Sequence, residues 1–248
     1  MAAPRRSLTS TVVRRGIESS LHRGGHTGAC SGATLRCPDA RDYGVELRDC
    51  CRGHIRRIVA DTAAVLNERG LVWWADYGTL LGAVRNPLTT WADYPWLTQT
   101  GRTTPGPTAG IIPHDKDADF GIFAADYRSL CVIRSKLERI SGYNVLIRPG
   151  GRSMKVRLSW RNHTNADFFI WNERPDGKLY RAKYIGADKY KGREFHKNTL
   201  FPLSTVEWEG MTLPAPKDPA AFCAFRYGEN WMKPVRANHD GVVRGESR

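Results

Sequence analysis

The sequence predicts a mixed α/β or α+β fold, because helical and strand-like segments alternate along it without an internal repeat. Between Glu46 and Arg69, apolar and small residues recur with the period of a helix, and Gly70 follows as a stop signal. Between Asp117 and Phe123, acidic and apolar residues alternate with the period of a strand. The 248 residues are enough for one sizeable domain with its own core.

The other expected elements follow in order along the chain. A tryptophan-rich strand over 71–76 turns on glycine into a short helix over 78–84, a corner that suits phosphate binding. Segment 86–110 is rich in Pro, Thr and Gly and is expected to be a long loop, of the kind that often serves as a lid. Beyond it we expect a helix over 125–141, strands over 143–147, 154–160, 166–171 and 179–185, a turn over 175–178 and a helix over 218–227.

Charge and hydropathy narrow the function classes. The formal net charge of +13 would attract phosphate-bearing ligands, and equally nucleic acid or an anionic lipid surface. Aromatic residues do not alternate with the arginines as a single-strand-binding surface requires, so a nucleic-acid partner is unlikely on this pattern. No apolar run approaches the roughly 20 residues of a membrane-spanning helix, so no membrane span is expected.

Segment 110–123 carries the main chemical signal. Asp115, Asp117 and Asp119 would share one face of a strand, while the residues between them would face a core and Gly121 would keep the acidic face open. Carboxylates this close raise one another's pKa unless a cation holds them ionised, and oxygen ligands suit Mg²⁺ or Mn²⁺. The pattern predicts a divalent-metal site, with a solvated acidic edge as the alternative.

A third carboxylate is a candidate member of this site, and the acidic segment also allows a second interpretation. Asp167 opens the apolar run 168–171 and either completes the metal site or is an ordinary turn residue. The aspartates at 115, 117 and 119 also occupy the first, third and fifth places of an EF-hand calcium loop, with Asp126 at the twelfth. Phe120 stands where the glycine of that loop belongs, so a calcium-binding module is the weaker interpretation.

Several ordered blocks resemble the LicD and fukutin-related phosphotransferases of the nucleotidyltransferase-like superfamily. The blocks span Asp76–Arg85, Ile112–Asp119, Ala166–Phe169, Leu200–Leu203 and Tyr227–Trp231, with Gly210, Pro214 and Pro216 between them. The resemblance implies a nucleotidyltransferase-like mixed sheet flanked by helices. It matches the Gly-Thr corner, the acid pair and the later single acid of that superfamily to Gly78, Thr79, Asp117, Asp119 and Asp167.

The resemblance also implies a reaction. Ribitol-, glycerol- or choline-phosphate would pass from a CDP-linked alcohol donor to a hydroxyl of a sugar or glycan acceptor, releasing CMP. The acid pair would hold Mg²⁺ or Mn²⁺, Asp167 would complete the site or take the acceptor proton, and Gly78 and Thr79 would contact phosphate. Lys155 and Arg157 alternate on a neighbouring strand and would bind the donor, or form an exposed basic edge. A nucleotidyltransferase releasing pyrophosphate would use the same carboxylates.

Four clustered cysteines and two departures from the family pattern bear on this resemblance. Four clustered cysteines resemble the structural zinc site of the fukutin-related ribitol-phosphate transferase, although their spacing alone lacks the paired pattern of zinc ribbons. These four are Cys30, Cys37, Cys50 and Cys51, whereas Cys131 and Cys223 are expected to be buried. Segment 86–110 lengthens the chain between the corner and the acid pair, and His114 replaces a usual tryptophan, so donor or acceptor specificity is expected to differ.

Four parts follow from these patterns. Residues 1–29, with five arginines against one acid, are expected to be a disordered basic tail or a targeting segment. Residues 30–70 would form a small zinc-binding cysteine element and the long helix, 71–234 the nucleotidyltransferase-like catalytic domain, and 235–248 a loose tail. No apolar secretion signal is present near the start, so a cytoplasmic location is expected.

Overall fold

The computed structural model describes residues 47–97, 104, 106–123, 125, 127–181 and 194–235. The expected basic tail at 1–29, together with Cys30, Cys37 and residues 236–248, lies outside the described residues. The described residues form a mixed α/β structure, which confirms the expected fold class.

One twisted sheet organises the described part of the chain and contains seven strands there. Its central path runs through β1 (Trp73–Ala75), β2 (Asp117–Phe123), β5 (Asn165–Glu173), β4 (Ser153–Arg157) and β3 (Asn144–Ile147). The second half of β5 pairs with β6 (Lys178–Arg181), which pairs with β7 (Glu194–His196). Strands β2 and β5 are parallel, and the other neighbouring pairs are antiparallel.

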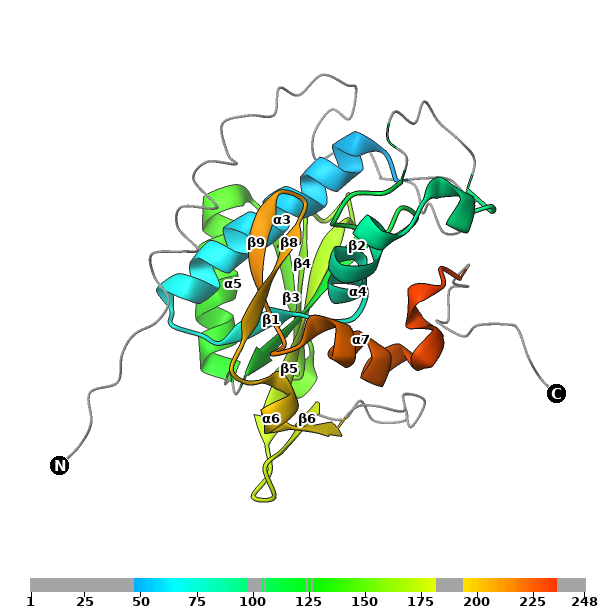
Figure 1. Cartoon of the computed structure of the whole chain (residues 1–248). Coiled ribbons are helices and arrows are strands. Elements are labelled where there is room, and N and C mark those ends of the chain that lie inside the picture. Colours follow the sequence, from blue (N-terminus) through cyan, green and yellow to red (C-terminus); the bar gives the residue numbers. More distant parts are fainter. Residues whose placement is uncertain are drawn as a thin grey trace.

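Helices cover both faces of this sheet (Figure 1). On one face lie α3 (Asp49–Glu68) and α5 (Tyr127–Ser141), and on the other lie α4 (Tyr77–Arg85) and α7 (Pro219–Tyr227). A separate hairpin of β8 (Ser204–Trp208) and β9 (Met211–Ala215) packs against β1 and α4. The short helices are α6 (Lys197–Leu200), η2 (Asn86–Leu88), η3 (Trp91–Asp93), η4 (Pro149–Gly151) and η5 (Glu229–Met232).

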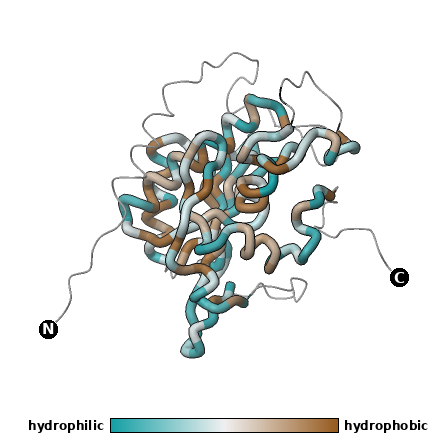
Figure 2. The backbone as a smooth tube through the Cα atoms, viewed as in Figure 1, coloured by the Kyte–Doolittle hydropathy of each residue, from teal (hydrophilic) through white to brown (hydrophobic). Residues whose placement is uncertain are grey.

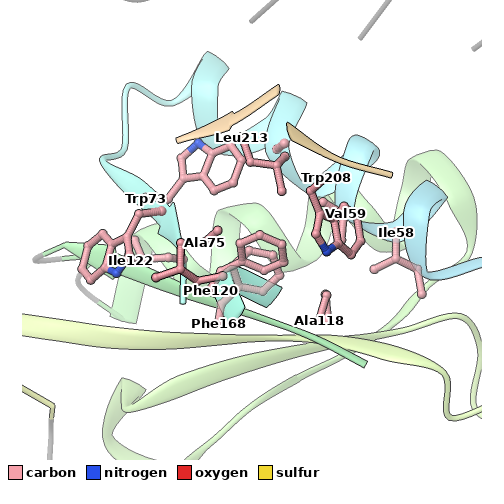
Figure 3. Close-up of a cluster of buried hydrophobic side chains, with 14 of the residues drawn as sticks. Ile58, Val59, Trp73, Ala75, Ala118, Phe120, Ile122, Phe168, Trp208 and Leu213 are labelled. Carbon is pink, nitrogen blue, oxygen red and sulfur yellow. The ribbon is translucent and has the colours of Figure 1, made fainter. Parts of the chain in front are cut away.

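The core lies between the sheet and the layer formed by α3, α5 and the β8–β9 hairpin. Phe120 is fully buried, stacks on Phe168 at 5.0 Å between ring centroids, and meets the edge of Trp73 at 5.6 Å. Figure 3 shows Ile58 and Val59 of α3 close to this cluster. Burying each such side chain contributes about 1.5–3 kcal/mol, so the strand's apolar face holds β2 in place. Figure 2 shows that the β5–β6 turn, which projects from the body of the molecule, is hydrophilic, in contrast to this apolar core.

Most of the observed helices and strands lie where the sequence predicts them, although several are shorter than predicted. The acidic strand has the predicted bounds, and the strand expected over 154–160 stops at Arg157 because 159–162 form a turn. Four elements between 194 and 215 were not predicted: β7, α6, β8 and β9. Part of the expected loop 86–110 is ordered, since the Nδ2 of buried Asn86 donates to the carbonyls of Thr108, Gly110 and Ile111.

None of the helices in the described ranges combines the length and the apolar character needed to cross a membrane.

Candidate functional site

Two rows of polar side chains run across β4, β5 and β2. In the first row, Lys155 lies opposite Asp167, and Asp167 lies opposite Asp119. The second row consists of Arg157, Asn165 and Asp117. Directly opposed residues of a sheet project to the same face, so the structure brings five of the predicted site residues together on one face. That face is the one covered by α4 and α7.

Asp167 is held by a cation and an amide. The Nζ of Lys155 lies 2.7 Å from its Oδ2, and the Nδ2 of Asn165 donates to the same oxygen at 3.2 Å. Burial raises the pKa of Asp167, and the charge of Lys155 opposes that rise. The predicted third carboxylate is therefore half-buried in the same row, and Lys155 is its ion-pair partner rather than part of an exposed basic edge.

Asp119 is the most crowded carboxylate of the site. Burial raises its pKa well above the usual range, and the negative charges of Asp117, Asp167 and Asp115 raise it further. Its backbone N–H donates to the hydroxyl of Thr79 at 2.7 Å. The carboxylates accumulate more negative charge than Lys155 alone neutralises, which is the situation a bound divalent cation relieves.

The N-terminus of α4 lies against these acids. Asp76 caps the helix, and its backbone N–H donates to the carbonyl of Asp119 at 3.0 Å. A Cβ added at Gly78 would come within 2.9 Å of the Asp115 carboxylate, so Gly78 allows this acid to approach the helix. Gly78 and Thr79 lie beside the acidic row, and Asp115 is the acid that packs on Gly78.

One expectation about the acidic face is wrong. Gly121 was expected to leave that face open beyond Asp119, but the indole of Trp74 covers it. A Cβ at Gly121 would lie 2.2 Å from two ring carbons of Trp74. Trp74 lies opposite Gly121 on β1, so the glycine makes room for a buried aromatic ring and the site ends at Asp119 on this side.

A buried ion pair joins α4 to α7 beside the site. The guanidinium of Arg226 forms two hydrogen bonds with the carboxylate of Asp76, at 3.0 and 2.8 Å. The side chains are 5 % and 0 % exposed, respectively. Burial acts to lower the pKa of Arg226, but the negative charge of Asp76, together with Tyr77 and Tyr227, raises it overall. Arg226 also lies over the ring of Tyr77 at 4.2 Å.

Three residues near the site were missed from the sequence. Arg226 and Tyr227 end α7, and Arg181 ends β6, far from the acid pair along the chain. The hydroxyl of Tyr227 has a pKa well above its usual range because of burial and the negative charge of Asp119, although 42 % of the residue is exposed. The available signal was the block Tyr227–Trp231 of the family resemblance, which Arg226 immediately precedes.

The donor set of the site fits Mg²⁺ or Mn²⁺ in its chemistry, because the acids that surround Asp119 offer only oxygen. No three side chains of His, Cys, Asp or Glu in the described part of the chain are arranged closely enough to hold a metal ion. Lys155 partly neutralises Asp167 and the charge of Lys116 interacts with Asp117, whereas Asp119 has no lysine or arginine ion-pair partner among the described residues. The Nε of Arg157 is buried without a hydrogen-bond partner among the described residues.

The calcium-loop interpretation does not fit the backbone. Residues 117–123 form a continuous strand that pairs with β5 in regular register, so the third to ninth positions of such a loop are extended strand. Asp126, the twelfth position of such a loop, lies outside the described residues.

The described cysteines lie away from the acidic row. Cys50 and Cys51 lie in the first turn of α3, their Sγ atoms are 3.9 Å apart, and each is disulfide-bonded in the structure. Cys223 is buried as expected, and burial raises the pKa of its thiol to about 12, whereas Cys131 is only half-buried.

Comparison with known proteins supports the resemblance. Residues 107–218 match the family described as LicD/FKTN/FKRP, nucleotidyltransferase domain. An uncharacterised protein of Rickettsia prowazekii is 27% identical over 177 residues, which is 71% of this chain and 54% of the relative. The human ribitol-5-phosphate transferase FKTN is 25% identical over 75% of this chain and 34% of its own length. Human ribitol 5-phosphate transferase FKRP is 24% identical over 80% of this chain and 38% of its own length.

The chain thus spans between about a third and just over half of these relatives. Among solved structures, the lincomycin-bound lincosamide adenylyltransferase LnuA superposes with a TM-score of 0.39 at 14% identity, covering 74% of this chain and 88% of that one.

Proposed function

We propose that this chain, whose residues 107–218 match the LicD/FKTN/FKRP nucleotidyltransferase domain, is a divalent-metal-dependent phosphotransferase. It transfers ribitol-, glycerol- or choline-phosphate from a CDP-linked donor to a sugar hydroxyl and releases CMP. The observation that carries the proposal is the register of β2 and β5, which places Asp119 beside Asp167 with Asp117 in the next row. The relatives named as ribitol-phosphate transferases support this donor class.

The acidic row would hold the metal and position the phosphates. Asp117 and Asp119 would bind Mg²⁺ or Mn²⁺, which supplies positive charge to stabilise the leaving diphosphate oxygen. Thr79 fixes the backbone of Asp119 through its hydroxyl, so the position of the acid pair depends on α4. Arg157, which lies across Asn165 from Asp117 in the second row, would neutralise phosphate charge.

Asp167 would accept the proton of the acceptor hydroxyl. Burial raises its pKa while Lys155 counteracts the rise, and a carboxylate in such an environment is a stronger base than one in water. Lys155 keeps Asp167 ionised and oriented through the 2.7 Å contact. The proton would leave the acceptor oxygen as that oxygen forms its bond to phosphorus and the bond to CMP breaks.

A second candidate is a nucleotidyltransferase that attaches a nucleoside monophosphate and releases pyrophosphate. It is favoured by the description of the matching family as a nucleotidyltransferase domain. The same carboxylates would serve both reactions, so product analysis separates them. CMP release from CDP-ribitol, CDP-glycerol or CDP-choline, with the phosphorylated alcohol found on a sugar acceptor by mass spectrometry, supports the first. Pyrophosphate release from nucleoside triphosphates, with no CMP from these donors, overturns it in favour of the second.

A structural zinc ion held by Cys30, Cys37, Cys50 and Cys51 is part of the proposal. Cys51 is fully buried at the start of α3, where metal binding would anchor the helix. Zinc requires thiolates, whereas the structure has Cys50 and Cys51 in disulfides. Zinc content and a thiol count in denaturant, measured on wild type and Cys51→Ser, decide between the two. One zinc per chain that Cys51→Ser lacks supports the metal, and thiols that appear only after reduction oppose it.

A further inference from the structure

Arg181, the last residue of β6, lies in an aromatic setting beside the site. Its guanidinium carbon is 3.6 Å from the centroid of the Phe169 ring, and its Nη1 donates to the hydroxyl of Tyr77 at 3.2 Å. The rings of Tyr77 and Phe169 meet edge to face at 5.3 Å. Contacts on its face and at one edge fix the planar group, and β5, β6 and α4 each supply one part of the arrangement.

The register of the sheet places this guanidinium near the acidic row. Arg181 lies opposite Trp171 on β5, and Phe169 follows Asp167 by two residues, so both belong to the same face. Two residues of a strand span about 6–7 Å. Burial raises the pKa of both Asp167 and Asp76, and the positive charge of Arg181 opposes that rise, so its charge acts on the site.

Arg181 differs from its neighbouring cations in its partners. Arg226 pairs with Asp76 and Lys155 pairs with Asp167. In the described ranges, the structure shows no carboxylate partner for Arg181. A guanidinium has five N–H donors, and only one is used by Tyr77. A half-buried, oriented cation with unused donors beside a carboxylate cluster is suited to bind an anion.

Phosphate is the anion that fits this arrangement. The guanidinium fork matches two phosphate oxygens, and a metal held by the carboxylates would contact other oxygens of the same group. We infer that Arg181, oriented by Tyr77 and Phe169, binds a phosphate of a nucleoside diphosphate group and defines a phosphate subsite on the β6 side of the acidic row. The inference rests on the proposed function in placing that diphosphate at the acidic row.

Arg174 provides a matched control on the same hairpin. It also stacks on an aromatic ring, that of Tyr180 at 5.2 Å, but its Nη2 pairs with Glu194 at 2.6 Å and it is exposed. Removing its charge changes the net charge of the hairpin as much as removing that of Arg181. A difference between the two variants therefore reports the local contacts of Arg181.

The experiment is calorimetric titration of inorganic pyrophosphate, and separately of CDP, into the full chain with Mg²⁺. Arg181→Met is expected to weaken both affinities about tenfold or more, while Arg174→Met leaves them unchanged. Arg181→Lys keeps the charge without the fork and should lie between wild type and Arg181→Met. If Arg181→Met does not fold, Arg181→Lys serves as the test variant. Tyr77→Phe should weaken binding less than Arg181→Met.

Unchanged affinity in Arg181→Met or in Arg181→Lys, equal losses in Arg181→Met and Arg174→Met, or no pyrophosphate binding by wild type at millimolar concentration would each overturn the inference. If Arg181-dependent binding is found but no CDP-linked alcohol is turned over, the subsite stands and the proposed donor class fails. The two failures are therefore distinguishable.

Discussion

The ammonium of Lys155 lies 2.7 Å from the carboxylate of Asp167, its direct neighbour across β4 and β5. Both side chains are mostly buried, at 21% and 15% exposure. On the other side of Asp167 lies Asp119, which no described lysine or arginine pairs with in this way. The site therefore has one carboxylate with a built-in counter-charge and one without, and the two respond differently to mutation.

Lys155→Met is expected to shift the acidic limb of the pH–rate profile to higher pH. Lys155 lowers the pKa of Asp167 against burial, so its removal lets that pKa rise, and activity requiring ionised Asp167 is lost at a higher pH on acidification. Lys197→Met is the control, because Lys197 pairs with Glu173 on the surface. An acidic limb in Lys155→Met that coincides with wild type contradicts the expectation.

Asp119→Asn is expected to stabilise the metal-free protein while abolishing activity. The folded state raises the pKa of Asp119 above its unfolded value, so the stability of wild type falls as pH rises from the unfolded towards the folded pKa. Asn removes this charge, so the unfolding free energy in EDTA should rise by about 1 kcal/mol or more near neutral pH and depend less on pH. Urea unfolding across pH measures both.

With a divalent metal present, wild type should be more stable than Asp119→Asn. Mn²⁺ is expected to raise the Tm of wild type but not of Asp119→Asn, because a ligand that binds only the folded state stabilises it. An Asp119→Asn variant less stable than wild type in EDTA would show that the carboxylate is satisfied without a cation.

Breaking the pair of Asp76 with Arg226 is expected to destabilise the fold strongly. Asp76→Asn leaves a buried guanidinium without its counter-charge, which costs about 3–5 kcal/mol. The double variant Asp76→Asn with Arg226→Met removes the stranded charge and should lose less than Asp76→Asn alone. Urea unfolding of the two single variants and the double variant tests this. Additive losses would show that the two residues act independently.

Gly78→Ala is expected to reduce turnover more than it reduces stability. The added Cβ would approach the carboxylate of Asp115 to 2.9 Å and displace this flexible acid from the N-terminus of α4. Gly53→Ala is the matched control, because nothing lies within 4 Å of a Cβ at this helical position. The control should gain up to about 1 kcal/mol and keep full activity. Equal activity in both variants would remove Gly78 from the site.

Local periodicity was sufficient for the parts of the fold that carry their own pattern. The helix ending at Glu68 repeats apolar residues on one face, and the acidic strand alternates two chemistries, so both were predicted with nearly correct bounds. The β8–β9 hairpin was missed because Pro214 interrupts its second strand and its turn uses Glu209-Gly210, with positive φ at both residues, rather than a common Asn-Gly pair.

The site residues likewise fall into two groups, those that a local sequence pattern marks and those that only the tertiary fold brings to the site. Asp117 and Asp119 stand out in the sequence because they are two residues apart, whereas Arg181 and Arg226 reach the surroundings of the site only through pairing of β5 with β6 and packing of α7 on α4. The error at Gly121 has the same origin. The strand pattern gave the direction of its missing side chain but could not show that Trp74 of β1 fills that space.

The most direct measurement is CMP release from CDP-ribitol, CDP-glycerol and CDP-choline with Mn²⁺ and a panel of sugar acceptors. Wild type is compared with Asp119→Asn, Asp167→Asn and the control Asp176→Asn, whose carboxylate lies on the exposed β5–β6 turn. We expect release from at least one donor that EDTA abolishes, that falls at least about 100-fold in Asp119→Asn and Asp167→Asn, and that Asp176→Asn retains. Metal-independent release, or full activity in Asp119→Asn, would contradict a metal-dependent transfer at the acidic row.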